Sequence, residues 1–564
     1  MNNLEKNSYV SYAPYLVVIY FILIWIKSSV FATDSLSFTQ NRLKTALSGN
    51  IKCGFPYILQ INAPGNEHLL RILQAQVKSL AQLDSLYISP SGYFRIYYSI
   101  TGFNAIPAYD RNDNGTPDYL EFVAKSFDRA WQIEIDSLGF KPPPDSTGEN
   151  RLYYPVYCRR LGVYGRTYPD YEIPNLPGLN YVSYIELNTN FSFIQYPGII
   201  DPIVRDSMAI AVTAAHEFNH ALQCGYRLWF GDDDFQDSWF IESSAVYMEE
   251  VVADEVNDYL HYLYDYLNNT RDPLDNSTGS YPDYGRVVLP IMLGELYGNN
   301  ITRKVWEGIR QQRALPSLEN VLNNLSSDVQ TEINRLALWC FYTNERAISN
   351  SFFPDATYFP SVNFIEGQSI TVAPAELISD LLPRLSFQWY HSPTETARQQ
   401  NLLLKAEGDA LASYLLSIYI DLSDGSSYFS PAATPYTLPF YLTAEGLPFS
   451  IVNGYNTGDL EFRFRLLSQP ALVVEDEDVY VFPQPFYLSN LQPHLNFKNV
   501  PKEAQIFIYN SHGKHLITLE SQIESQVIFW DLETQYGETI GSGVYLFKVK
   551  SENREHVGKF VVIR

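Results

Sequence analysis

The pattern of apolar and polar positions changes character near residue 360. Before this point, apolar residues recur at helical spacing in several stretches, with short strand-like runs between them. After it, apolar and polar residues alternate, turn residues are frequent and helix signals are almost absent. The pattern predicts a multidomain α+β chain, with a mixed domain over 91–358 and two β-sandwich, Ig-like domains over 359–473 and 474–564. The last boundary is drawn at the acidic run 474–478, which is typical of a linker.

Within the first 360 residues, two helices carry most of the chemistry. One is predicted to begin with Asp206 or Ser207 as its N-cap and to end near Gly225. The second is predicted from Ser238 to Asp254, and further helices fill 257–345. Other predicted elements are a helix over 68–83, a strand from Tyr93, a helix after residue 121 that ends near Gly139, and strands over 152–158 and 181–189.

The N-terminus has the features of a targeting segment. Tyr15–Ile26 is a run of twelve apolar residues, and Val30-Phe31-Ala32 offers the small residues that a signal peptidase needs. A spanning helix needs about 20 apolar residues, so a signal peptide over 1–32 is favoured over an uncleaved N-terminal anchor. No other stretch is long and apolar enough to span, so no stable transmembrane anchor is expected after cleavage. Residues 33–90 are then an N-terminal segment and a candidate propeptide.

Composition narrows the class of partner. The net charge is −24, and an acidic surface repels phosphate backbones, so nucleic acid is not an expected partner. Charged residues make up only 18% of the chain while Tyr (43) and Phe (33) are abundant, which suits β-rich extracellular domains. The four cysteines, Cys53, Cys158, Cys224 and Cys340, allow three disulfide pairings in an exported protein, or they are buried thiols.

The segment His216-Glu217-Phe218-Asn219-His220 is the strongest chemical signal. Histidines at i and i+4 of a helix place both imidazoles on one face, at a spacing that suits one Zn²⁺ ion. Glu217 lies beside them and is predicted to be the general base that takes a proton from water. The Ala-rich surroundings favour a buried metal site over two surface histidines.

A catalytic zinc site needs a third protein ligand and an open position for water. Glu242 is the preferred candidate, because a second helix packed on the first places its carboxylate beside the histidines, and Ser243, Ser244 and Ala245 permit close approach. Glu249 and Glu250 remain competitors, although a solvated helix end explains them equally simply.

Residues that assist the reaction are harder to identify. Tyr281, Tyr284 and His261 are candidates for stabilising the oxyanion, and Tyr284 is taken as a catalytic candidate. Asp237 is a candidate either for orienting a zinc histidine or for capping the second helix.

An acidic loop over 110–121 follows the spacing of an EF-hand calcium loop, with Gly115 at position 6. A helix follows but none clearly precedes it, and an Asn/Asp-rich turn is the alternative. A structural Ca²⁺ site is predicted, with ligands from Asp110, Asn112, Asn114, Thr116, Asp118 and Glu121.

Several blocks resemble a family of bacterial secreted proteins that are assigned by motif as zinc metalloproteases. The matching blocks are Tyr93–Tyr98, Asn114–Tyr119, Ala215–Gln223 and Trp239–Glu250. The resemblance covers roughly residues 90–350. It implies a zincin-like catalytic domain with Glu242 as a gluzincin-type ligand, and it supplies no substrate.

The last 85 or so residues resemble a type A C-terminal sorting domain of the type IX secretion system. The matching pieces are Tyr480–Phe486, Ile506–Gly513, Trp530–Asp531, Gly541–Tyr545 and Gly558–Arg564. Gln484 stands where the family usually has Asn. The resemblance implies passage through the periplasm and the outer membrane, secretion machinery as a partner, and a secreted or cell-surface location.

The segment Lys52-Cys53-Gly54 is similar to cysteine-switch segments, in which a propeptide thiolate occupies the open position of the zinc. A disulfide or a buried thiol is the simpler alternative for Cys53.

The preferred function is a secreted zinc endopeptidase acting on protein or peptide substrates. The alternatives are a non-catalytic surface adhesin on a zincin scaffold and a metallohydrolase of non-peptide amides.

Overall fold

The fold is described from a computed structural model of the chain. The structure describes residues 52–62, 83–173, 180–228, 237–277, 281–348, 351–369 and 375–393, the backbone of strands between 401 and 470, and most of 479–563. The predicted signal peptide, its apolar run and the predicted helix over 68–83 lie outside the described residues. In the part of the chain that is described, no helix is long and apolar enough to cross a membrane.

The chain forms two compact units. Unit 1 contains the chain up to Tyr266 together with Asp275–Leu325, and unit 2 contains Leu267–Leu274 and Ser326–Arg564. Unit 1 combines a sheet with many helices, and unit 2 is mostly strands, so the prediction of a mixed α+β chain is confirmed at this level.

Unit 1 is built on a five-stranded sheet with the order β1-β2-β3-β5-β4. Strands β2, β3 and β5 run parallel, and β1 and β4 pair antiparallel at the two edges. The bounds are β1 Ser85–Ile88, β2 Phe94–Tyr98, β3 Tyr154–Arg159, β4 Gly165–Glu172 and β5 Tyr181–Asn188. The strands expected from Tyr93, over 152–158 and over 181–189 are therefore confirmed, whereas β1 and β4 were not predicted.

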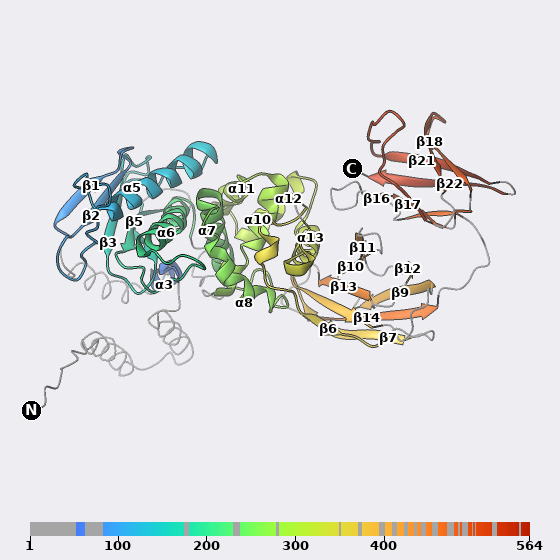
Figure 1. Cartoon of the computed structure of the whole chain (residues 1–564), viewed down its shortest axis with the longest axis horizontal. Coiled ribbons are helices and arrows are strands. Elements are labelled where there is room, and N and C mark those ends of the chain that lie inside the picture. Colours follow the sequence, from blue (N-terminus) through green and yellow to red (C-terminus); the bar gives the residue numbers. More distant parts are fainter. Residues whose placement is uncertain are drawn as a thin grey trace, which may run out of the picture. The chain divides into compact units, whose positions relative to one another are not determined.

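Two helices, α5 and α6, pack together beside this sheet (Figure 1). Helix α5 (Asp118–Trp131) continues into a π-helical turn, η1 (Gln132–Ser137), and the chain leaves it through Gly139 at a positive φ of 81°. Helix α6 (Pro202–Cys224) contacts β4 and β5 and carries both candidate zinc histidines.

The start of α6 corrects the sequence prediction. Its N-cap is Asp201, whose side chain accepts a hydrogen bond from the Ile203 N–H at 2.9 Å, and Pro202 occupies the first helical position. Asp206 and Ser207 therefore lie inside the helix. Proline suits that first position because it lacks the N–H that would be unpaired there. The predicted end is confirmed, because Gly225 is the C-cap.

Helix α7 (Ser238–Ala253) packs along α6, and it matches the predicted second helix apart from one residue at its end. The remaining described helices bear out the prediction that helices fill 257–345. They are η2 (Asp258–Tyr262), α8 (Leu263–Leu267), α9 (Tyr281–Gly285), α10 (Val288–Tyr297), α11 (Ile301–Ile309), α12 (Ala314–Asn324), α13 (Val329–Phe341) and η3 (Asn344–Arg346). A further 3-10 turn, η4 (Ala356–Tyr358), lies beyond that range. A short helix, α3 (Phe55–Asn62), precedes the sheet in sequence and contacts β4.

Unit 2 contains four sheets in addition to α13, and the region after 360 is β-rich as predicted. Two sheets have the orders β11-β10-β13-β8-β6 and β12-β9-β14-β7. Their bounds are β6 Phe364–Glu366, β7 Ala375–Pro383, β8 Phe387–Ser392, β9 Asn401–Gly408, β10 Tyr414–Asp421, β11 Ser427–Ala433, β12 Thr437–Tyr441, β13 Leu447–Asn453 and β14 Glu461–Pro470.

The C-terminal strands form the other two sheets, with the orders β15-β17-β20 and β16-β22-β21-β18-β19. Their bounds are β15 Tyr480–Phe482, β16 Phe486–Tyr487, β17 Leu495–Lys498, β18 Gln505–Asn510, β19 His515–Glu520, β20 Val527–Trp530, β21 Gly543–Ser551 and β22 Arg554–Ile563. One apolar cluster, built from residues between Val479 and Val562, fills the space between these strands.

Candidate metal centre

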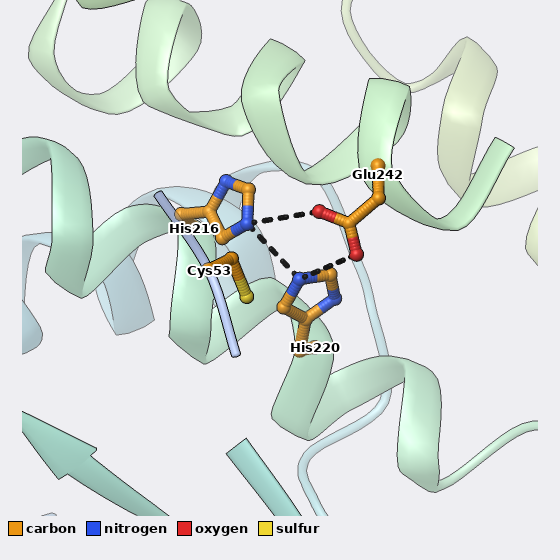
Figure 2. Close-up of side chains that lie close together, drawn as sticks. All are labelled: Cys53, His216, His220 and Glu242. Atoms are coloured by element: carbon orange, nitrogen blue, oxygen red, sulfur yellow. Dashed lines mark hydrogen bonds and ion pairs between the residues drawn. The ribbon is translucent and has the colours of Figure 1, made fainter. Parts of the chain in front are cut away.

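The two histidines of the motif converge on one point. His216 and His220 both lie on α6, are 1% and 0% exposed, and their Nε2 atoms are 3.0 Å apart. The Glu242 carboxylate reaches the same point from α7, with its oxygens 3.4 Å from His216 Nε2 and 3.5 Å from His220 Nε2 (Figure 2). The structure therefore brings together the three predicted zinc ligands.

A fourth group completes this cluster. Cys53, which comes just before α3, places its sulfur near the two imidazoles, and Figure 2 shows it on the side of them away from Glu242 in that view. One ligand atom from each of Cys53, His216, His220 and Glu242 lies within 4.8 Å of the others, and all four residues are buried. In a tetrahedral zinc site, bonds of about 2.0 to 2.3 Å place neighbouring ligand atoms about 3.3 to 3.8 Å apart.

The donor set fits a metal ion. Both Glu242 oxygens are buried and accept no hydrogen bond, although each lies at ion-pair distance from a histidine. A buried carboxylate without hydrogen bonds is costly, and a cation in the gap between the three side chains offsets that cost. Two imidazoles, a carboxylate and a thiol are also the ligand types that Zn²⁺ prefers.

Each histidine is held through its other ring nitrogen. His216 Nδ1 is 2.7 Å from Glu249 Oε1, and His220 Nδ1 is 2.8 Å from Gln223 Oε1. Because both partners are acceptors, each Nδ1 carries the proton and donates it, which directs the Nε2 lone pairs toward the shared point. The tautomers are assigned from these contacts.

The position of Glu249 overturns one interpretation from sequence. Glu249 is 2% exposed, so it is not part of a solvated helix end; it accepts hydrogen bonds from His216 and Lys52. Asp237, a sequence candidate for orienting a histidine, lies instead 3.8 Å from Arg313, and its side chain caps no N–H of α7.

A chain of buried hydrogen bonds connects Gln223, the partner of His220, to Glu134 in the π-helical turn η1. Gln223 Nε2 donates to Asn219 Oδ1 at 2.7 Å, and Asn219 Nδ2 donates to Glu134 Oε2 at 2.8 Å. Burial raises the pKa of Glu134 well above its usual value, against the hydrogen bond from Asn219. Sequence analysis missed this network, although Gln223 follows His220 by one helical turn.

Electrostatics in the metal-free protein favour a charged pair. Burial alone lowers the pKa of His216, but Glu242 and Glu249 outweigh it and raise that pKa to about 9. Burial alone raises the pKa of Glu242, but His220 and His216 outweigh it and hold that pKa at about 2.

Glu217 lies next to the converging ligands. It is 1% exposed, and its Oε2 accepts a hydrogen bond from Thr167 Oγ1 on β4 at 2.8 Å. Helix and strand approach closely here because residue 165 is glycine: a Cβ at Gly165 would stand 2.8 Å from Glu217 Cγ and 2.7 Å from Thr213 Cγ2. Glu217 also faces the Cys53 thiol, and burial followed by Glu217 and Glu242 raises the pKa of that thiol well above its usual value.

The other sequence candidates lie at different distances from this centre. Tyr284 is fully buried, and its ring centroid is 6.1 Å from that of His216. His261 lies beside Asp258, which raises the pKa of the imidazole. The side chain of Tyr281 lies outside the described residues. A catalytic role for Tyr284 stays a prediction.

The predicted calcium loop is held together largely by its own side chains. Glu121 accepts hydrogen bonds from Asn112 Nδ2 at 2.9 Å and Asn114 Nδ2 at 2.7 Å. Asp110 accepts from the N–H groups of Asn114 and Gly115, and Asp118 accepts from the N–H of Arg111. Gly115 has a positive φ of 84°, as position 6 of the motif requires. The calcium site stays a prediction.

The remaining cysteines carry no disulfide. All four cysteines are described, free and buried. None of the three pairings considered from sequence is present.

No family's sequence profile matches this chain. No curated protein matches it either. Similar solved structures include PorZ, a bacterial surface component of the type-IX secretion system of Porphyromonas gingivalis, at 21% identity over 18% of this chain and 14% of that chain, with a TM-score of 0.15. They also include latent PorU from Porphyromonas gingivalis, at 17% identity over 34% of this chain and 20% of that chain, with a TM-score of 0.13. Such scores, over small parts of each protein, carry no argument about fold or activity.

Proposed function

We propose that this chain is a secreted zinc-dependent endopeptidase with a zincin-like catalytic region in unit 1. The observation that carries the proposal is the convergence of His216, His220 and Glu242 on one buried point, with the buried Glu217 carboxylate facing Cys53, the fourth member of the cluster. A metal site that only stabilises a fold does not need an additional carboxylate that is close to the metal but is not one of its ligands.

The chain's own residues have distinct roles in this reaction. Zinc bound at this point supplies Lewis-acid polarisation of the scissile carbonyl and lowers the pKa of water. Glu217 takes the proton from the attacking water and passes it to the leaving amine. Thr167 fixes Oε2 of Glu217 by its hydrogen bond, which leaves Oε1 for the proton transfer. Glu249 and Gln223 keep the two imidazoles in place throughout.

Export by a type IX system, with the C-terminal strands as the sorting domain, belongs to the same proposal. It rests on the resemblance of the segments within 480–564, and the described strands β15–β22 are compatible with a small β domain.

One observation favours a second candidate. Cys53 gives the cluster four protein ligands, and closed four-ligand zinc sites are usually structural. A non-catalytic surface protein with a structural metal is the alternative function.

The test is zinc content and casein hydrolysis for wild type and Glu217→Gln, each measured before and after limited proteolysis. The amide has nearly the same size as the carboxylate, so one zinc per chain is expected in both. Only wild type should hydrolyse casein. Zinc in both proteins with no hydrolysis by either favours the non-catalytic alternative, and no zinc in either contradicts the site itself.

A further inference from the structure

Residues 52–54 lie along the edge of the unit 1 sheet next to the candidate metal centre. The Tyr164 N–H donates to Lys52 O at 2.9 Å, and the Gly54 N–H donates to Gly165 O at 3.1 Å. Cys53 and Gly165 thereby form a parallel bridge at the start of β4. Because β4 is an edge strand, this is where an extended peptide can add to the sheet by main-chain hydrogen bonds.

The side chain of Cys53 enters the metal centre from this segment. Its sulfur belongs to the four-residue cluster, and its neighbour Phe55 stacks on the His220 ring with centroids 4.2 Å apart. If His216, His220 and Glu242 bind zinc, the Cys53 thiol would occupy the fourth position, which a catalytic site leaves to water.

Lys52 anchors the segment on the other side of Cys53. Its ammonium group is buried and makes ion pairs with Glu249 and Asp258, and it lies 5.1 Å from the centre of the Tyr262 ring. Glu249 also holds His216, so Lys52 is connected to the metal centre through one shared carboxylate. An apolar side chain in place of Lys52 would leave the two buried carboxylates without a cation, which would destabilise the protein.

We propose that residues 52–59 are an intramolecular inhibitor, in which Cys53 closes the metal as a thiolate and Lys52 holds the segment in place. This rests on the proposed function. On metal binding the thiol loses its proton to solvent, and no electrons are transferred. Hydrolysis of one peptide bond between Asn62 and Ser85 by another protease frees the segment, and water then takes the position of the sulfur.

The first measurement is spectroscopic and needs no substrate. The full-length mature protein is loaded with one Co²⁺ per chain, because a thiolate bound to Co²⁺ gives a near-ultraviolet charge-transfer band that imidazole and carboxylate ligands do not give. We expect the band in wild type and in the control variant Cys158→Ser, and its loss in Cys53→Ser. One Co²⁺ per chain in all three proteins shows that the variants have folded.

The second measurement opens the segment. A recognition site for a specific protease is placed within residues 66–80 of the full-length chain, and the protein is cut after folding. We expect the cobalt band to disappear on cutting, and casein hydrolysis by the zinc form to begin at the same time. Uncut Cys53→Ser should hydrolyse casein without any cutting.

The outcomes separate this proposal from the proposed function. A wild-type protein with one Co²⁺ and no band overturns the inhibitor proposal, as does a band that survives cutting. Casein hydrolysis by uncut wild type at the same measurable rate as by uncut Cys53→Ser overturns it as well. Loss of the band on cutting with no hydrolysis in any form supports a removable thiolate but contradicts the endopeptidase.

Discussion

At the scale of single residues, the sequence predicted the metal ligands and the general base but not most of the residues that hydrogen-bond to them. His216 and His220 were predicted because helix geometry places residues at i and i+4 on one face, and Glu242 because it begins a second helix with small residues that permit close packing on the first. Glu249 was left as either a competing ligand or part of a solvated helix end, and its partner Lys52 lies 197 residues earlier in the chain. No local pattern carries information about such a partner, so Lys52, Thr167 and Glu134 were not predicted.

The titration of the ligands gives a prediction about proton release. In the metal-free protein, His216 has a pKa of about 9 and the pKa of Cys53 is raised well above 9.0, so both are protonated at pH 7.5. A bound zinc ion displaces these protons, because metal ligands must be deprotonated. Calorimetry at pH 6, below the pKa of about 7 of a zinc-bound water, in buffers of different ionisation enthalpy should give about one proton more released per zinc in wild type than in Cys53→Ser. Equal proton counts in the two proteins would contradict a role for Cys53 as a ligand.

The ion pair of His216 and Glu242 sets a pH window for the stability of the metal-free protein. His216 has a folded pKa above the ordinary imidazole value of 6.5, so its stabilising effect is complete below that value and is lost as pH rises through about 9. Glu242 has a folded pKa below the ordinary glutamate value of 4.5, so its stabilising effect is complete above that value and is lost as pH falls through about 2. The two pKa shifts arise largely from the same interaction between His216 and Glu242, so their contributions to the free energy of unfolding are not added together.

At the scale of elements, the contact of α6 with β4 decides where Glu217 lies. The helix was predicted because its apolar and small residues have a clear helical spacing, but β4 was missed. Its sequence begins with Gly165 and contains Pro169, and both residues weaken a strand pattern. Their value becomes visible only in the fold: the strand is an edge strand, and Gly165 lets the helix approach.

Substitution at this contact should affect both stability and activity. In Gly165→Ala, the new methyl group meets Glu217 and Thr213 at less than 3.0 Å, so α6 must shift away from β4. Overpacking of this kind costs about 1 to 3 kcal/mol, which urea denaturation should detect, and the displaced Glu217 should lower kcat more than it lowers zinc affinity. Gly162→Ala is the matched control, because a Cβ there has no neighbour within 4 Å. Equal stability of the two variants would show that this contact is not as close as described.

At the scale of the whole molecule, the metal centre and the C-terminal strands are separate structures. Every residue of the centre belongs to unit 1, whereas β15–β22 share an apolar cluster drawn only from residues between Val479 and Val562. The sequence pattern predicted a change from helices to strands near residue 360, because the period of the apolar residues changes there. It did not predict that α13 belongs to unit 2, since helical spacing carries no information about which unit a helix joins.

This separation leads to a prediction about residues 474–564. A protein that ends at residue 473 loses a self-contained apolar cluster but no residue of the metal centre, so it should bind one zinc with unchanged affinity. It should also gain casein hydrolysis on cutting, as the full-length protein does. In a bacterium with a type IX system the same truncation should stop export, so that the protein accumulates in the periplasm. Fractionation after expression of both forms measures this, and the Glu217→Gln protein with its C-terminus intact is the control, since it should still be exported. Normal export of the truncated protein would show that residues 474–564 are not the export signal. They would then resemble a sorting domain in sequence without having its function.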